Sequence, residues 1–95
     1  MILKKIKKMS NNKQTILDVR TPEEFRGGNV KGSINIPLQE IPKRLAEIKA
    51  LQHPIVLCCA SGGRSGQATA FLKNEGLNCE NGGSWMDVQY NYQTA

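Results

Sequence analysis

The sequence predicts one small α/β domain, built as an α/β/α sandwich of three layers around a four- to five-stranded, mostly parallel sheet. Two observations lead to this fold class. Short apolar runs alternate with helical patterns over 15–95, and strands that alternate with helices form parallel sheets covered on both faces. A length of 95 residues suits one domain with a modest core. We expect this domain to follow a basic, partly disordered terminus over 1–14.

The first elements are a strand and a capped helix. Residues 15–19 read Thr-Ile-Leu-Asp-Val, an apolar and β-branched run that is typical of a short buried strand. Thr21 stands three residues before Glu24 with Pro22 between them, which is the spacing of a capping box with proline at the first helical position. The pair Gly27–Gly28 predicts that this helix ends within about two turns.

A second strand and a second helix follow in the middle of the chain. Residues 33–36 read Ser-Ile-Asn-Ile before a proline, which predicts a short strand. Ile41, Leu45 and Ile48 are then spaced four and three residues apart. This spacing puts them on one face of a helix, which we expect over 42–50.

The last third of the chain carries the most regular alternation. Residues 55–58 are apolar and predict the central strand, and residues 65–75 form a helical pattern after it. A short final strand is expected over 77–80. Gly82–Gly83 then turns the chain into a terminal helix, for which Ser84 is the expected N-cap.

Cys59 stands where the central strand ends. Ligands bind beyond the carboxyl ends of strands in open α/β sheets. The free amides and the dipole of a following helix stabilise anions there, and the same field favours thiolate over thiol. The sequence therefore predicts a reactive cysteine in an anion-binding loop, whose other members are Ala60, Ser61, Gly62, Gly63, Arg64 and Ser65.

The charge of the chain is concentrated at its start. The net charge is +5, and four of the thirteen cationic residues are the lysines at positions 4, 5, 7 and 8. The rest of the chain is nearly neutral, so the composition does not indicate nucleic-acid binding. We interpret the lysine run as a solvated terminus, or as a segment that is weakly attracted to anionic surfaces or partners.

Cysteine usage and hydropathy indicate the compartment. Three cysteines, two of them adjacent, do not form a disulfide framework and suit a reducing environment, so a cytoplasmic location is expected. No run approaches the ~20 apolar residues of a membrane span, and the basic start lacks the apolar segment of a signal peptide. No spaced Cys/His set suggests a metal site, and no cofactor is expected.

Three segments together resemble the rhodanese family, in particular its small single-domain bacterial members. The segments are 17–25 (Leu-Asp-Val-Arg-Thr-Pro-Glu-Glu-Phe), 30–37 (Val-Lys-Gly-Ser-Ile-Asn-Ile-Pro) and 59–65 (Cys-Ala-Ser-Gly-Gly-Arg-Ser). They occur in the right order, and the likeness covers residues 15–88. It implies a rhodanese-like fold and a sulfurtransferase. In that chemistry a cysteine takes sulfane sulfur from a donor such as thiosulfate, becomes a persulfide, and passes the sulfur to cyanide, a thiol or a protein acceptor.

The resemblance also assigns roles to residues. Cys59 is the expected nucleophile, and the loop amides from Ala60 to Ser65 are expected to surround its sulfur. The Arg64 side chain either binds an anionic donor or braces the loop, and the resemblance favours bracing. It places Asp18 near the loop, where a pair with Arg64 would support it. Arg20 either lines the pocket or is a solvated loop residue.

Other functions remain open at this stage. From Cys59 to Arg64 the loop has six residues, the length that the resemblance associates with sulfurtransferases. The phosphatases and arsenate reductases of the superfamily have one residue more, so a function of that kind is disfavoured. A module that binds a partner or carries a persulfide for it is the main alternative. Cys58 and Cys79 are interpreted as core residues.

Overall fold

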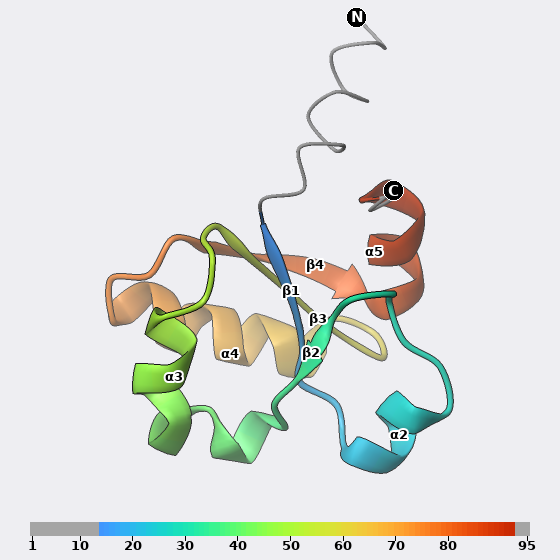
Figure 1. Cartoon of the computed structure of the whole chain (residues 1–95), viewed down its shortest axis with the longest axis horizontal. Coiled ribbons are helices and arrows are strands. Elements are labelled where there is room, and N and C mark those ends of the chain that lie inside the picture. The colour runs from blue at the N-terminus through green and yellow to red at the C-terminus, as the bar shows by residue number, and fades with distance from the viewer. Residues whose placement is uncertain (1–13, 93–95) are drawn as a thin grey trace, which may run out of the picture.

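The computed structural model describes residues 14–92 (Figure 1). All but the last residue of the basic segment expected over 1–14 lies outside the described residues. The strands are β1 (Thr15–Asp18), β2 (Ile34–Asn35), β3 (Ile55–Cys59) and β4 (Cys79–Ser84). The helices are α2 (Pro22–Arg26), α3 (Leu45–Lys49), α4 (Gly63–Asn74) and α5 (Trp85–Asn91), with 3₁₀ turns η1 (Leu38–Glu40) and η2 (Pro42–Arg44).

The strands form one sheet in the order β2-β1-β3-β4. Each neighbouring pair is parallel, which confirms the predicted α/β class with a parallel sheet. Among residues 14–92 the sheet has four strands, the lower of the two numbers expected. Because all strands run the same way, their carboxyl ends, including the end of β3 at Cys59, meet at one edge of the sheet.

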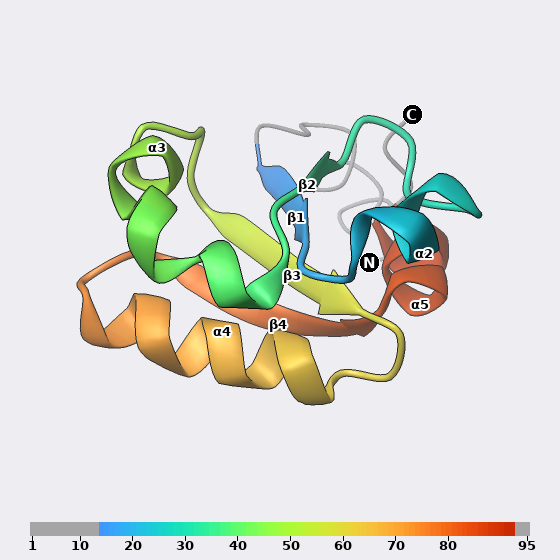
Figure 2. The same ribbon diagram turned by 90° about the horizontal axis from the view of Figure 1, so that it is seen from below.

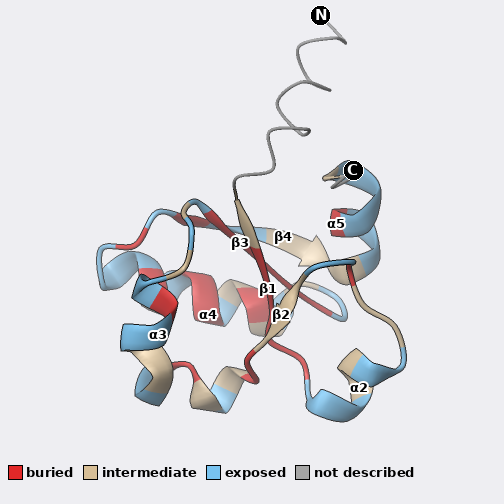
Figure 3. Ribbon diagram, in the orientation of Figure 1, coloured by how far each residue is buried: buried red, intermediate tan, exposed pale blue. Residues whose placement is uncertain are grey.

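Helices and turns cover both faces of this sheet. Leu17, Leu57 and Cys59 face a core shared with α3, α4 and η1, whereas Val56 and Cys58 face a smaller core under α5. Consecutive strand residues point to opposite faces, so the apolar runs in β1 and β3 serve both cores. Figure 3 shows the resulting burial along these two strands. Figures 1 and 2 both place α3 at the opposite end of the molecule from α2 and α5.

The N-terminus of α2 has the predicted capping box. The Thr21 hydroxyl accepts a hydrogen bond from the Glu24 amide, and the Glu24 carboxylate accepts one from the Thr21 amide at 2.9 Å. Pro22 stands at the start of the helix, and Gly27 caps its end. The local sequence thus determined this element completely.

Three elements differ from the predicted bounds by two or more residues, whereas β1, β2 and β3 differ by no more than one residue at either end. The helix expected over 42–50 is divided at Arg44, whose backbone leaves the helical region (φ −109°, ψ 21°), into η2 and α3. Helix α4 begins two residues earlier than expected, at Gly63. The last strand covers Cys79–Ser84 rather than 77–80 because its pairing with β3 continues to Cys59.

The extension of β4 depends on Gly82. Leu57 pairs with Asn81 and Cys58 pairs with Gly83, so Gly82 is the extra residue of a β-bulge. A Cβ atom on Gly82 would lie 2.6 Å from Cγ2 of Val88 and 2.8 Å from Cγ1 of Val56. Helix α5 therefore packs on β4 at a distance that only glycine allows.

We predict that Gly82→Ala destabilises the fold by about 1–3 kcal/mol, because the added methyl group must displace two buried valines. Urea unfolding followed by circular dichroism measures this change. Gly63→Ala is the matched control, since a Cβ there meets no atom within 4 Å. Equal stability of the two variants would contradict the close packing of α5 on β4.

Candidate functional site

The Cys59 sulfur lies inside a turn of backbone amides at the carboxyl end of β3. Its Sγ accepts a hydrogen bond from the Gly62 amide at 3.0 Å and from the Ser65 amide at 3.4 Å, and it lies 3.4 Å from the Ser65 hydroxyl oxygen. Gly62 has a φ of +106°, a conformation that glycine adopts without strain. The loop therefore directs donors toward the sulfur instead of away from it.

The remaining loop residues lie at the rim and at the start of α4. Ala60, Ser61 and Gly63 are exposed, whereas Ser65 is fully buried. Helix α4, which begins at Gly63, has twelve residues, so its N-terminal dipole adds positive potential at the loop.

The loop amides change the acidity of Cys59. Burial alone would raise the pKa of this thiol, but hydrogen bonds from the Ser65 hydroxyl and from the amides of Ser65, Gly62 and Ser61 lower the pKa to about 7. Close to half of the thiol is then ionised at neutral pH.

The pKa values of the other two cysteines are raised instead of lowered. Burial, and then the charge of Asp18, raises the pKa of Cys58 to about 12. Burial also raises the pKa of Cys79. All three cysteines are free, so the structure contains one acidic thiol and two that stay protonated.

The expected pair between Asp18 and Arg64 does not form. Asp18 is fully buried and instead binds Arg20, with Nη2 2.7 Å from Oδ2 and Nε 2.9 Å from Oδ1. The physical reason is strand alternation: Asp18 is in register with Cys58, so its side chain and the Cys59 side chain point to opposite faces of the sheet.

Arg20 supports a different segment from the Cys59 loop. Its guanidinium donates to the Gly28 carbonyl at 2.7 Å and to the Glu24 carbonyl at 3.3 Å. It also lies 5.0 Å from the ring centre of Trp85, a cation–π arrangement. Arg20 is 4% exposed, so it is not a solvated residue, and its bonds to the Glu24 and Gly28 carbonyls brace the chain between α2 and β2.

Arg64 finds its partner on α2. Its Nη1 and Nη2 atoms lie 2.8 Å and 3.0 Å from the two carboxylate oxygens of Glu24, a bidentate pair that joins the first turn of α4 to α2. Hydrogen bonds from Arg64 and then from the Thr21 amide lower the pKa of Glu24 to about 2. Sequence reasoning identified Glu24 only as a capping residue, although a carboxylate has enough lone pairs for both partners.

A second residue that the sequence reasoning missed is Asn81, in the extended part of β4. Its side-chain oxygen lies 2.7 Å from the Ser65 hydroxyl oxygen, and its side-chain nitrogen donates to the Gly62 carbonyl at 3.1 Å. The signal available in the sequence was the polar residue directly before Gly82–Gly83.

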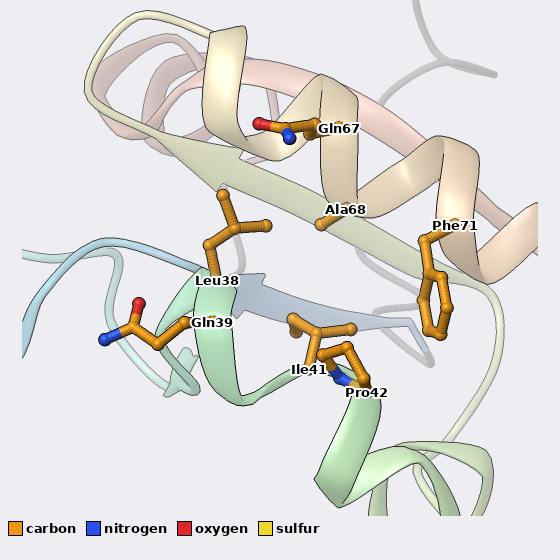
Figure 4. A pocket seen from close by; sticks show the side chains of 7 residues that line it. All are labelled: Leu38, Gln39, Ile41, Pro42, Gln67, Ala68 and Phe71. Atoms are coloured by element: carbon orange, nitrogen blue, oxygen red, sulfur yellow. The ribbon is translucent and has the colours of Figure 1, made fainter.

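A shallow cavity of about 230 Å³ lies between η1 and α4 (Figure 4). It lies beside the core that contains Cys59. Its lining carries no charged side chain, so the cavity itself does not suit an anion. The lining residues are Leu38, Gln39, Ile41, Pro42, Gln67, Ala68 and Phe71.

Residues 14–92 contain neither a cluster of metal-binding side chains nor a membrane-spanning helix. In that range no three side chains of His, Cys, Asp or Glu come together as they do around a metal ion. The helices of the same range are all too short or too polar to cross a bilayer.

Comparison with known proteins connects this geometry to a family. The family model described as "Rhodanese-like domain" matches residues 3–88. The chain is 41% identical over 64 residues to the uncharacterized protein YqhL of Bacillus subtilis, covering 67% of this chain and 50% of that protein. It is 36% identical over 74 residues to the thiosulfate sulfurtransferase PspE of Escherichia coli, covering 76% of this chain and 71% of that protein.

A solved structure gives the same result. The structure titled "rhodanese with anions from E. coli" has a TM-score of 0.72 and 35% sequence identity, and covers 79% of this chain and 91% of that one. The chain thus spans most of this structural neighbour but only half of the first of the two relatives.

We predict that Cys59 reacts with iodoacetamide with a pH midpoint near 7, because only the thiolate is alkylated. The pH dependence of alkylation, read at each cysteine by peptide mass spectrometry, measures this midpoint. Cys58 and Cys79 serve as internal controls and should stay unmodified in the folded protein. A midpoint for Cys59 at or above the ordinary thiol value of 9.0 would contradict the proposed action of the amides.

We also predict that Glu24→Gln lowers the free energy of unfolding by about 0.2–1 kcal/mol at neutral pH, since more than a third of the ion pair is exposed and solvent screens it. A carboxylate with a lowered pKa stabilises the fold fully above its unfolded value of 4.5 and loses this effect as the pH falls toward about 2. The difference between wild type and variant should therefore disappear over that interval.

Thermal unfolding of both proteins between pH 7 and pH 2 tests the Glu24 prediction. Glutamine can still cap α2, so the variant removes the charge and keeps the cap. Glu23→Gln, on the same helix with only a 4.0 Å contact to Arg26, is the matched control. A stability difference that stays constant with pH would argue against the ion pair.

Proposed function

The chain belongs to the rhodanese-like domain family, and on that premise we propose that it is a sulfurtransferase in which Cys59 carries the sulfur as a persulfide. Thiosulfate or a similar sulfane compound is the proposed donor, and cyanide or a thiol is the proposed acceptor. The observation that supports the proposal most is the Cys59 sulfur, held by the amides of Gly62 and Ser65 with its pKa lowered to about 7.

The first proposed step transfers sulfur to the protein. The Cys59 thiolate attacks the outer sulfur of thiosulfate and forms a new S–S bond, while the S–S bond of thiosulfate breaks and sulfite leaves with the electron pair. The protein then carries a persulfide anion, and total charge is conserved. Donors already aimed at the reacting sulfur support this step, because they stabilise negative charge without rearranging.

The second proposed step returns Cys59 to its starting state. Cyanide, or the thiolate of an acceptor, attacks the outer persulfide sulfur. The bond between the two sulfurs breaks, the Cys59 sulfur leaves as a thiolate, and the product is thiocyanate or a new persulfide. Cys59 is suited to leave in this step because a thiol of low pKa is a good leaving group.

In this proposal the Arg64 side chain braces the loop and does not bind the donor. Its bidentate pair with Glu24 supports this role, because both carboxylate oxygens already occupy the guanidinium. The same pair argues against phosphate or arsenate chemistry, in which a free arginine would be needed to bind an oxyanion. We also propose a reducing compartment such as the cytoplasm, which suits three free thiols.

We predict that incubation with thiosulfate adds the mass of one sulfur atom to Cys59, and that Cys59→Ser abolishes both this addition and thiocyanate formation. Intact-mass and peptide mass spectrometry measure the first result, and a colorimetric thiocyanate assay measures the second. Cys58→Ala is the matched control, because that thiol faces the opposite core from Cys59 and should not be needed.

Other results would identify another function. Wild-type protein that acquires no sulfur from thiosulfate or from other sulfane donors would contradict the sulfurtransferase proposal. Loading without turnover on cyanide or small thiols, together with discharge to a protein thiol, would favour the persulfide-carrier alternative. Hydrolysis of an aryl phosphate that depends on Cys59 would indicate a phosphatase.

A further inference from the structure

Asn81 connects three points around the Cys59 loop. Its side-chain oxygen lies 2.7 Å from the Ser65 hydroxyl oxygen and accepts a hydrogen bond from the Gly83 amide at 3.0 Å. Its side-chain nitrogen donates to the carbonyl of Gly62 at 3.1 Å. Asn81 itself is exposed at the end of the sheet, so these contacts and not burial hold its side chain in place.

The backbone partners fix which way this amide faces. The Gly83 N–H can only donate and the Gly62 carbonyl can only accept, so the oxygen of Asn81 must face Gly83 and its nitrogen must face Gly62. That oxygen is also the atom next to Ser65. Because an amide oxygen only accepts, the Ser65 hydroxyl can bond to Asn81 only by donating its proton.

The Ser65 hydroxyl has two possible acceptors for its one hydrogen. The Ser65 hydroxyl oxygen lies 3.4 Å from the Cys59 sulfur but 2.7 Å from Asn81, and a hydroxyl has a single hydrogen to donate. The sulfur and the Asn81 oxygen therefore compete for this one hydrogen, and the bond to Asn81 weakens the contribution of the hydroxyl to the lowered pKa of Cys59.

The position of Asn81 follows from the bulge in β4. Cys79 faces the core under α4, and strand alternation puts Asn81 on the same face, toward Ser65 in the first turn of α4. The Gly83 amide directly follows the bulge residue Gly82 and donates to the Asn81 oxygen at 3.0 Å. A regular strand would not bring this N–H and the Ser65 hydroxyl to one acceptor.

We propose that Asn81 is a positioning residue for Cys59, which holds the Ser65 hydroxyl away from the sulfur and so limits the stabilisation of the thiolate. The inference deepens the proposed function, since it concerns the same nucleophile. It has a chemical reason: the nucleophilicity of a thiolate falls as its pKa falls, and the best attacking thiol has a pKa near the ambient pH. One donor fewer keeps Cys59 reactive.

Charged and titratable groups near Cys59 come from four elements. Arg64 lies on α4 and is paired with Glu24 of α2. Cys58 precedes Cys59 on β3. Asp18 of β1 lies on the opposite face, paired with Arg20. None of these groups is changed in the experiment below, so its result reports on the hydroxyl.

The test measures the pKa of Cys59 from the pH dependence of its alkylation by iodoacetamide, read by peptide mass spectrometry. In Asn81→Ala the Ser65 hydroxyl is free to donate to the sulfur. A full hydrogen bond in place of a shared one should lower the pKa by about 0.5–1 pH unit. Well below the midpoint, alkylation should then be roughly two- to fourfold faster, because the lower nucleophilicity of the more acidic thiolate offsets part of the gain in thiolate. In the double variant Ser65→Ala/Asn81→Ala this lowering should disappear.

Three controls separate this effect from a loosened loop. Asn78→Ala makes the same change at an exposed asparagine of the preceding turn and should leave the pKa of Cys59 unchanged. Thermal unfolding shows whether each variant is folded. Ser65→Ala alone should raise the pKa by less than Asn81→Ala lowers it, because the wild-type hydroxyl is shared between Asn81 and the sulfur.

Specific results would overturn the proposal. An unchanged or raised pKa in folded Asn81→Ala would do so, as would a lowering that persists without the Ser65 hydroxyl. A rise of the pKa in Ser65→Ala that exceeds the fall in Asn81→Ala would show that the wild-type hydroxyl donates mainly to the sulfur. Because alkylation needs no sulfur donor, these outcomes are independent of whether the protein accepts sulfur from thiosulfate.

Discussion

The site depends on one constraint: an apolar strand ends in a cysteine whose sulfur must take its hydrogen bonds from the next turn of backbone. The Gly62 and Ser65 amides meet this need, and the left-handed conformation of Gly62 allows the turn. The rest of the fold keeps this turn in place. The parallel sheet delivers Cys59 to its edge, α4 starts directly behind the loop, and the bulge in β4 brings a polar side chain against it.

Two arginines support different parts of the structure. Arg20 is buried with Asp18 and Trp85 on the α5 side, where it fixes the segment after α2. Arg64 reaches from α4 to Glu24. Glu24 thus both begins α2 and ties that helix to the loop, so the capping residue of one helix orients the N-terminus of another.

Sequence reasoning succeeded where the determining contacts are local. A few neighbouring residues determine the capping box at Thr21 and the position of Cys59 at a strand end. It failed where distant residues meet: Glu24 and Arg64 are 40 positions apart, and the bulge at Gly82 is needed only because of Val88 and Val56. The error at Asp18 has the same cause, because the register that pairs Asp18 with Cys58, and so turns its side chain away from the Cys59 face, is set between two strands that are distant in sequence.

The alternating pleat of β3 also isolates the three sulfurs from one another. Cys58 and Cys59 are adjacent in sequence but project into different cores, with the peptide sheet between them. Cys79 shares a face with Cys59 but is in register with Ile55, four residues down the strand, or about 13 Å away. An oxidised Cys59 consequently has no internal thiol to resolve it, and its repair depends on a reductant from outside the molecule.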